Sequence, residues 1–185
     1  MGAIRTPDDV MPLCAITSRY DEAFAWALQR FAAAGFIVRR QSDRFPFDMT
    51  NYYQAEMGDD LLKEIFVFEP LRDPWQLADW KRMTNEWETE FKSANSFPED
   101  RPLNLDPGYL TLAKFVLATT KDRDHRLYLR DGIFAEVTMS FTAGQWKSHP
   151  WTYPDYQLPV AQSFLVQARE SLKELFREQA RQSLQ

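Results

Sequence analysis

The segment from Asn104 to Thr138, NLDPGYLTLAKFVLATTKDRDHRLYLRDGIFAEVT, carries most of the features that decide the fold. Two turn signals divide it. Asp106-Pro107-Gly108 predicts a turn, because proline fixes φ and glycine permits a positive φ. Asp131-Gly132 lies between two runs rich in β-forming residues and is a strong signal for a two-residue hairpin. Most of the polar residues that could carry chemistry lie between and after these turns.

Hydrophobic periodicity outside this segment predicts alternating strands and helices. Asp73-Pro74 is a clear helix start, since aspartate is a preferred N-cap and proline suits the first helical position. Residues 109–118 fit either a short helix or a buried strand, and we expect the helix. The expected strands are residues 13–17, 36–41, 62–68, 103–105, 127–129, 133–141 and 145–147, and the expected helices lie within 18–35, 50–57, 73–92 and 164–177.

This order of elements predicts an α+β fold. Strand–helix–strand–strand–helix–strand, followed by a hairpin and a closing helix, suits a mostly antiparallel sheet with helices packed on one face. A ferredoxin-like βαββαβ arrangement accommodates the first six elements. A length of 185 residues fits a single domain. We expect a flexible arm over residues 1–12, one domain over 13–177 and a frayed tail over 178–185.

Composition excludes several classes of function. The net charge of −5 and the sequence pI of about 5.1 argue against broad binding to nucleic acid or to anionic membranes. No stretch approaches the roughly 18 apolar residues that a membrane helix needs. The single cysteine, Cys14, excludes an intrachain disulfide and a zinc site made of cysteines, and its apolar neighbours predict a buried side chain. With no secretory signal visible, we expect a cytoplasmic protein.

Basic side chains gather between residues 121 and 130 of this acidic chain. Arginine forks and lysine point charges could hold phosphate or carboxylate there. The alternative is that neighbouring aspartates neutralise the cluster at the surface, and we prefer this for Arg123 and Arg130. For Lys121, His125 and Arg126 both explanations stay open. His125 is the candidate acid or base for catalysis, because histidine titrates near neutral pH.

The chain resembles the domain-of-unknown-function family numbered 4416 in a series of short motifs. These motifs are Asn104–Tyr109, Leu117–Lys121, His125-Arg126, Ala135–Thr138, Phe45–Phe47, Tyr52-Tyr53, Glu56–Gly58, Thr84–Glu86 and Trp151–Tyr156. The resemblance implies a bacterial or archaeal protein with an Asp-Pro-Gly motif and implies no activity, because the family has none established. It also falls on Lys121, His125 and Arg126, which favours them as site residues.

Some relatives in that family carry a GTP-binding label, which the residues do not support. The chain has no G-x-x-x-x-G-K-[ST] loop, and its nearest fragment, Gly144–Ser148, lacks the first glycine and the spacing. The G-x-S-x-G turn of serine hydrolases is also missing. Two histidines are too few for a histidine-rich metal site. Carboxylates could still bind Mg²⁺ beside a nucleotide. Three of the four have a simpler explanation as a turn, cap or surface residue, whereas for Glu136 a pocket-lining and a solvent-facing position both stay open. These carboxylates are Asp48, Glu56, Asp106 and Glu136.

We therefore expect a binding site for a small anionic ligand, such as a nucleotide or phosphoester, built from residues 104–138. Whether the ligand is also turned over stays open. The expected ligand-binding residues are Asp106, Lys121, His125, Arg126, Glu136 and Tyr153. A turn at residues 130–132 should fold Arg126 back beside Glu136, with Lys121 in the same concavity and His125 at its rim. The alternative is a non-catalytic adaptor or structural subunit in which these motifs only shape turns.

Overall fold

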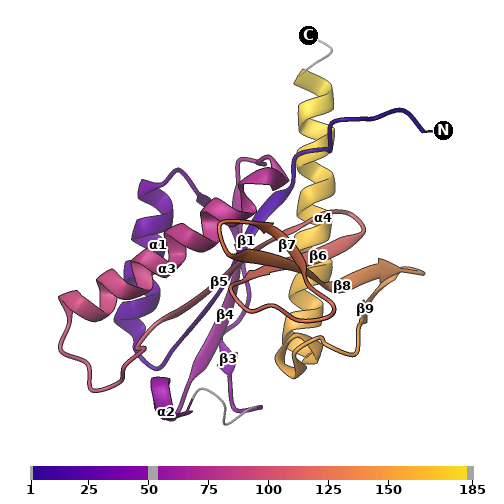
Figure 1. Ribbon diagram of the computed structural model, residues 1–185. Coiled ribbons are helices and arrows are strands. Elements are labelled where there is room, and N and C mark those ends of the chain that lie inside the picture. Colours follow the sequence, from indigo (N-terminus) through magenta and orange to yellow (C-terminus); the bar gives the residue numbers. More distant parts are fainter. Residues whose placement is uncertain (1, 50–53, 183–185) are drawn as a thin grey trace.

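The computed structural model of the protein describes residues 2–49 and 54–182 (Figure 1). It contains one antiparallel sheet with the order β2-β4-β1-β5-β6-β8-β7, while β3 pairs with β4 and β9 pairs with β8. The strands are β1 (Met11–Ser18), β2 (Ile37–Gln41), β3 (Phe45–Pro46), β4 (Leu62–Glu69), β5 (Asn104–Leu110), β6 (Lys114–Thr119), β7 (Leu127–Arg130), β8 (Ile133–Thr142) and β9 (Gln145–Ser148). The α+β class and the antiparallel sheet predicted from the sequence are confirmed.

Helices cover both faces of this sheet. They are α1 (Asp21–Ala33), α2 (Gln54–Met57), α3 (Leu77–Ala94) and α4 (Pro159–Gln182), with the short 3₁₀ helices η1 (Pro74–Gln76) and η2 (Pro154–Gln157). In Figure 1, α1 and α3 lie together on one side of the sheet and α4 lies on the other. The prediction of helices on one face holds for α1 and α3 and is wrong for α4.

The central strand β1 explains why both faces need a cover. All eight of its residues are buried. Cys14 and Ile16 join the core beneath α1 and α3, while Leu13 and Ala15 join the core beneath α4. Successive side chains of a strand point to opposite faces, so a strand that is buried at every position must be covered on both faces. The burial predicted for Cys14 is confirmed.

The first six major elements run β1-α1-β2-β4-α3-β5, which is the predicted order. Their strands occupy one half of the sheet in the order β2-β4-β1-β5. The sheet then continues through β6, β8 and β7, beyond the four strands of a ferredoxin-like domain. That narrower description therefore stays a prediction.

The segment around Asp106-Pro107-Gly108 is a strand and not a turn, and residues 109–118 do not form a helix. β5 runs through all three residues, and β6 pairs with it from Gly108 onward. The chain reverses at 111–113, where the Thr111 hydroxyl accepts hydrogen bonds from the backbone N–H groups of Ala113 and Lys114. Proline is tolerated because Pro107 pairs with Cys14 of β1 and lies just outside the pairing with β6. Burial of the apolar run on β6 overrides the local turn and helix signals.

The two remaining local signals are confirmed. Asp131 and Gly132 join β7 to β8 with φ values of 54° and 76°, the left-handed geometry of a type I′ turn. The Asp73 side chain accepts a hydrogen bond from the Trp75 backbone N–H at 2.8 Å and so caps η1 ahead of α3. Both signals depend on a few adjacent residues, so they can be predicted from the sequence.

Both ends of the folded part reach further than the sequence suggested. Val10 pairs with Arg72 and β1 begins at Met11, within the expected flexible arm, and α4 continues to Gln182, within the expected tail. The helix expected over 50–57 is represented by α2, while residues 50–53, including Tyr52-Tyr53, lie outside the described residues. None of the helices in the described ranges combines the length and apolar character that a membrane crossing requires.

Gly108 is required by the close approach of β5 and β6. Its φ is not positive, so the predicted turn does not explain it. A Cβ at this position would lie 2.2 Å from the backbone oxygen of Val116 and 2.9 Å from Leu117 Cδ2. We expect Gly108→Ala to lower the free energy of unfolding by about 1–3 kcal/mol, measured by denaturant titration, because overpacking forces the strands apart.

The control for this variant is Gly132→Asn, because a Cβ there meets nothing within 4 Å and asparagine tolerates a positive φ. We expect Gly132→Asn to cost less than Gly108→Ala. Equal stability of Gly108→Ala and the parent would contradict the close approach of the two strands.

Candidate functional site

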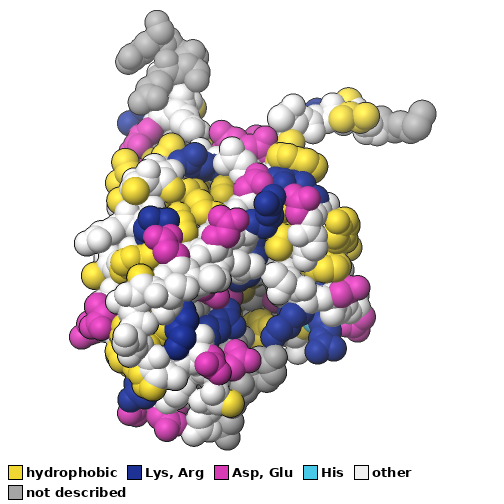
Figure 2. Space-filling view, turned by 60° about the vertical axis from the view of Figure 1, so that its left-hand side comes forward, with side chains coloured by type: hydrophobic (Ala, Val, Ile, Leu, Met, Phe, Trp, Pro, Cys, Tyr) yellow, Lys and Arg dark blue, Asp and Glu magenta, His cyan; other side chains and the backbone are white. Residues whose placement is uncertain are grey.

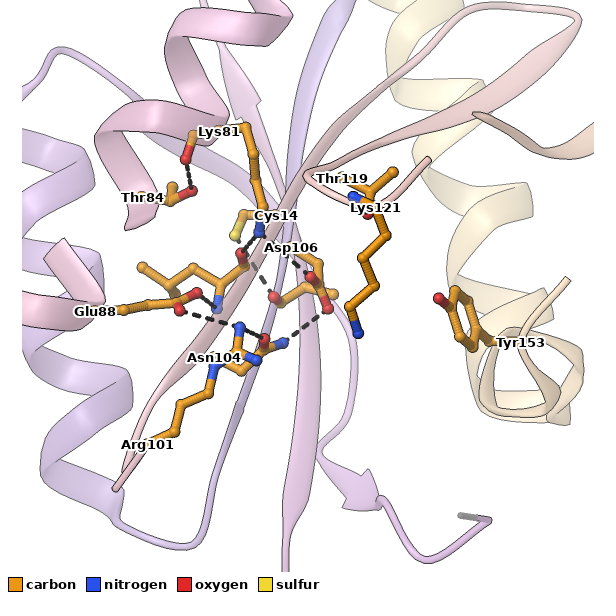
Figure 3. Close-up of polar contacts among 12 residues, drawn as sticks. Cys14, Lys81, Thr84, Glu88, Arg101, Asn104, Asp106, Thr119, Lys121 and Tyr153 are labelled. Atoms are coloured by element: carbon orange, nitrogen blue, oxygen red, sulfur yellow. Dashed lines mark hydrogen bonds and ion pairs between the residues drawn. The ribbon is translucent and has the colours of Figure 1, made fainter. Parts of the chain in front are cut away.

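Most of the predicted site residues line one cavity of about 110 Å³. Asp106, Lys121, Arg126, Glu136 and Tyr153 all contribute to its wall, although they come from four segments of the chain. Figure 3 shows Lys121 extending from the end of β6 towards Asp106, with Tyr153 on the other side of the lysine. The predicted concavity shared by Lys121, Arg126 and Glu136 is therefore present.

Arg126 and Glu136 form the predicted pair across the β7–β8 hairpin. Arg126 Nε donates to Glu136 Oε2 at 2.8 Å, and the two side chains are only 5% and 2% exposed. The other guanidinium nitrogens donate to the Lys121 carbonyl oxygen at 2.8 Å and to the Tyr153 hydroxyl at 3.3 Å. Arg126 thereby links Glu136 of β8, the backbone of Lys121 and the side chain of Tyr153.

His125 lies beside the cavity and is not among the described residues that line it. Its Nε2 is 3.4 Å from Glu136 Oε2, and its Nδ1 is 3.1 Å from Asp124 Oδ1. Its ring stacks on Trp151 with centroids 4.9 Å apart, and His149 stacks on Trp151 at the same centroid distance. In this geometry His125 reaches the cavity only through Glu136, so a direct catalytic contact with a ligand would need the ring to move.

A network of charges that the sequence did not suggest forms the wall on the side of α3 (Figure 3). Lys81 Nζ donates to the Leu105 carbonyl oxygen at 2.8 Å and lies 3.6 Å from Asp106 Oδ1. Asn104 Nδ2 donates to Asp106 Oδ2 at 2.8 Å. Arg101 donates to the side-chain oxygen of Asn104. These contacts tie the start of β5 to the N-terminal part of α3 and to Arg101.

Glu88 is the last member of this network. It accepts from the Leu105 backbone N–H at 2.6 Å and from Arg101 at 3.0 Å. Burial raises the pKa of Glu88, although Lys81 and Arg101 act in the opposite direction. Burial alone would also raise the pKa of Asp106, but Lys81 and Lys63 and the hydrogen bond from Asn104 bring that pKa below its usual value. Asp106 therefore stays a carboxylate through neutral and mildly acidic pH.

A buried ion pair closes another side of the cavity. Lys63 Nζ donates to Asp155 Oδ2 at 2.6 Å, and these side chains are 4% and 2% exposed. The ammonium also lies 4.1 Å from the ring centroid of Phe47 and 4.9 Å from that of Tyr156. Both charged residues line the cavity. Such a pair is costly to desolvate and is tolerated when partners and rings surround the ammonium.

Some of the cavity residues that the sequence analysis did not identify leave a recognisable signal in the sequence, and others leave none. Lys63 interrupts the apolar strand β4, and Lys81 lies on the helix face that carries Trp80 and Thr84. A charge at a position that the periodicity assigns to the core is a sign of a buried polar site. Asp155, in the 3₁₀ helix η2, has no such signature.

Cations exceed carboxylates around the cavity. Among the described residues that line it, the cations are Lys63, Lys81, Arg101, Lys121 and Arg126, and the carboxylates are Asp106, Glu136 and Asp155. The excess is local, because basic and acidic side chains are intermingled across the face shown in Figure 2. A small anion is the ligand charge that this wall favours.

Of the four carboxylates considered for Mg²⁺, Asp106 and Glu136 line the cavity, and the other two lie elsewhere. Asp48 lines a separate hollow, and Glu56 lies 4.0 Å from Arg101 NH1. Within residues 2–49 and 54–182, no group of three or more His, Cys, Asp or Glu side chains is arranged to hold a metal ion.

Comparison with known proteins gives one match. The family model described as a domain of unknown function, DUF4416, matches residues 8–172. No curated protein and no solved structure matches the chain. The matched range includes every strand and most of α4, so it covers the whole cavity.

The Lys63–Asp155 pair gives a stability prediction. Asp155→Ala should lower the free energy of unfolding by about 3–5 kcal/mol, because it leaves the Lys63 ammonium buried without its carboxylate. Denaturant titration measures the loss. The double variant Lys63→Met/Asp155→Leu removes both charges and should recover most of it. If the double variant is as unstable as Asp155→Ala, the unpaired charge is not the cause.

The lowered pKa of Asp106 gives a pH prediction. A carboxyl whose pKa is lower in the folded state stabilises the protein above its unfolded pKa of about 3.9, and this contribution is lost as the pH falls through the folded value. Asp106→Asn removes the titration. We therefore expect thermal melting between pH 5 and pH 3 to show a smaller loss of stability for Asp106→Asn than for the parent. The same pH dependence in both proteins would contradict the pKa shift.

Proposed function

The chain belongs to the DUF4416 family, and from the cavity of this member we propose that the protein binds a small anion of the phosphoester class. The observation that carries the proposal is the convergence of cationic side chains from β4, α3, the loop before β5 and the connection between β6 and β7. Arginine and lysine donors are the groups that proteins use to hold phosphate. A bacterial source and a cytoplasmic location belong to the same proposal.

The size of the cavity limits the size of the ligand that it can enclose. Pockets that enclose drug-sized ligands have volumes of roughly 300–1,000 Å³. The cavity of about 110 Å³ is much smaller, so it suits a phosphate group with a short carbon skeleton. A nucleotide would leave its base outside, against Tyr153, which is 40% exposed. The phosphoester is therefore the ligand we prefer over a fully enclosed nucleotide.

Binding without turnover is the simpler function for this arrangement. His125 contacts Glu136 and does not line the cavity, and Arg126 is committed to three protein acceptors. A general acid or base must come within hydrogen-bonding reach of the group that reacts. We accordingly propose a binding protein, with Arg126 as a positioning residue.

The adaptor alternative has one observation in its favour. β7 forms a free edge of the sheet, and its side chains Leu127 and Tyr128 are 74% and 62% exposed. Exposed apolar edge strands are surfaces on which another chain can pair. This edge is separate from the wall of the cavity, so a pairing function there would be compatible with anion binding.

A thermal-shift titration with inorganic phosphate tests the proposal. A ligand that binds only the folded state at a hundred times its Kd stabilises the protein by about 2.7 kcal/mol, so the melting temperature should rise with phosphate concentration. Lys121→Met should weaken binding about tenfold or more, because it removes a charged donor from the cavity. Sodium chloride at matched ionic strength separates site binding from general screening.

Lys114→Met is the matched control for this experiment. Lys114 is the first residue of β6, the strand that ends shortly before Lys121. It is exposed and is not among the described residues that line the cavity. Both variants lose one positive charge, so a loss confined to Lys121→Met locates the binding. A phosphate response that is absent, or that weakens equally in both variants, would overturn the proposed function.

Arg126→Ala is unsuitable as the test variant. The substitution would leave the Glu136 carboxylate buried without its principal partner and would lower stability for that reason alone. The pairwise replacement Arg126→Gln/Glu136→Gln removes both charges and is the appropriate way to examine this pair.

A further inference from the structure

The carboxylates of the cavity point to a more specific ligand. Resting on the proposed function, we infer that the ligand is a phosphate monoester of a polyol, whose hydroxyl groups donate hydrogen bonds to Asp106 while its phosphate contacts the cationic side chains. A bare anion would use only the cations. Asp106, the most exposed carboxylate of the same wall, then needs an explanation of its own.

Asp106 is the carboxylate with access to a ligand. Its side chain lines the cavity and is 28% exposed, whereas those of Glu136 and Asp155 are each 2% exposed. Oδ2 accepts one hydrogen bond from Asn104, and Oδ1 lies 3.6 Å from Lys81 Nζ. An ionised carboxylate has about four acceptor sites and no donor. Asp106 therefore keeps acceptor capacity that faces the cavity.

Charge repulsion makes this capacity selective. A ligand phosphate held by Lys121 and Lys81 would share the cavity with the negative Asp106. Like charges in one site disfavour each other, so Asp106 weakens the binding of an anion that offers no donor. A hydroxyl group on the carbon skeleton reverses the effect, because it can donate to the carboxylate in a charge-assisted hydrogen bond.

Glu136 provides a second, independent indication. It is only 2% exposed, and it lines the same cavity. Oε2 is contacted by Arg126 and His125, but Oε1 has no hydrogen-bond partner among the described residues. Buried polar atoms in native proteins nearly always have a partner. A ligand hydroxyl group that displaces the wall slightly would supply one.

The test compares two ligands of the same carbon count. Glycerol 3-phosphate and n-propyl phosphate differ in their hydroxyl groups, and isothermal titration calorimetry measures both affinities. We expect the parent protein to prefer glycerol 3-phosphate by about tenfold or more, the usual effect of a hydrogen bond to a charged group. In Asp106→Asn this preference should fall several-fold, while the affinity for n-propyl phosphate stays the same or increases.

Glu170→Gln is the control for loss of one carboxylate, because Glu170 is on α4 and does not line the cavity. It should keep the preference of the parent. Equal affinity of the parent for the two ligands would overturn the inference, as would an unchanged preference in folded Asp106→Asn. Since the first of these comparisons uses only the parent protein, the inference stays falsifiable even if Asp106→Asn does not fold.

The outcomes separate this inference from the proposed function. Binding of inorganic phosphate and n-propyl phosphate without a preference for glycerol 3-phosphate would leave an anion site and remove only the polyol. Failure of the parent to bind any of the three compounds would overturn both.

Discussion

The pairing of cationic side chains, most of them buried, with carboxylates is the interaction on which the cavity depends. Lys63 is held by Asp155, Arg126 by Glu136, and Arg101 by Glu88. An isolated charge in the interior is too costly to persist, whereas a paired and hydrogen-bonded charge is tolerated. These pairs allow a protein with a large apolar core to keep a polar hollow beside its central strands.

The sheet brings the paired residues together. β1 lies between β4 and β5, so Lys63 of β4 and Asp106 of β5 are two strands apart and line the same cavity. α3 crosses over β5, where Lys81 donates to the carbonyl oxygen of Leu105 and Glu88 accepts from its N–H. The loop that carries Tyr153 and Asp155 then closes the wall ahead of α4. The helix α3 and the 3₁₀ helix η2 are therefore part of how the cavity is enclosed.

A wall of mixed charge has consequences for recognition. Pairs that satisfy each other add little net attraction, so affinity would come from the excess of cations and from donors left after pairing. Specificity would come from the carboxylates, which repel anions that lack hydrogen-bond donors. The stacked rings of His125, Trp151 and His149 lie behind Glu136 and support this wall.

The sequence by itself determined the features that depend on a few adjacent residues. The Asp131-Gly132 turn was predictable because two positive φ values are needed there, and the Arg126–Glu136 pair followed from it, since only 10 positions separate the partners. Only the tertiary structure decided that Lys63 meets Asp155, 92 positions away, because their contact depends on how β4 and η2 pack. Tertiary structure also decided that Asp106-Pro107-Gly108 is a strand, although its local signal is a turn. Pairing with β1 and β6 outweighs the local preference.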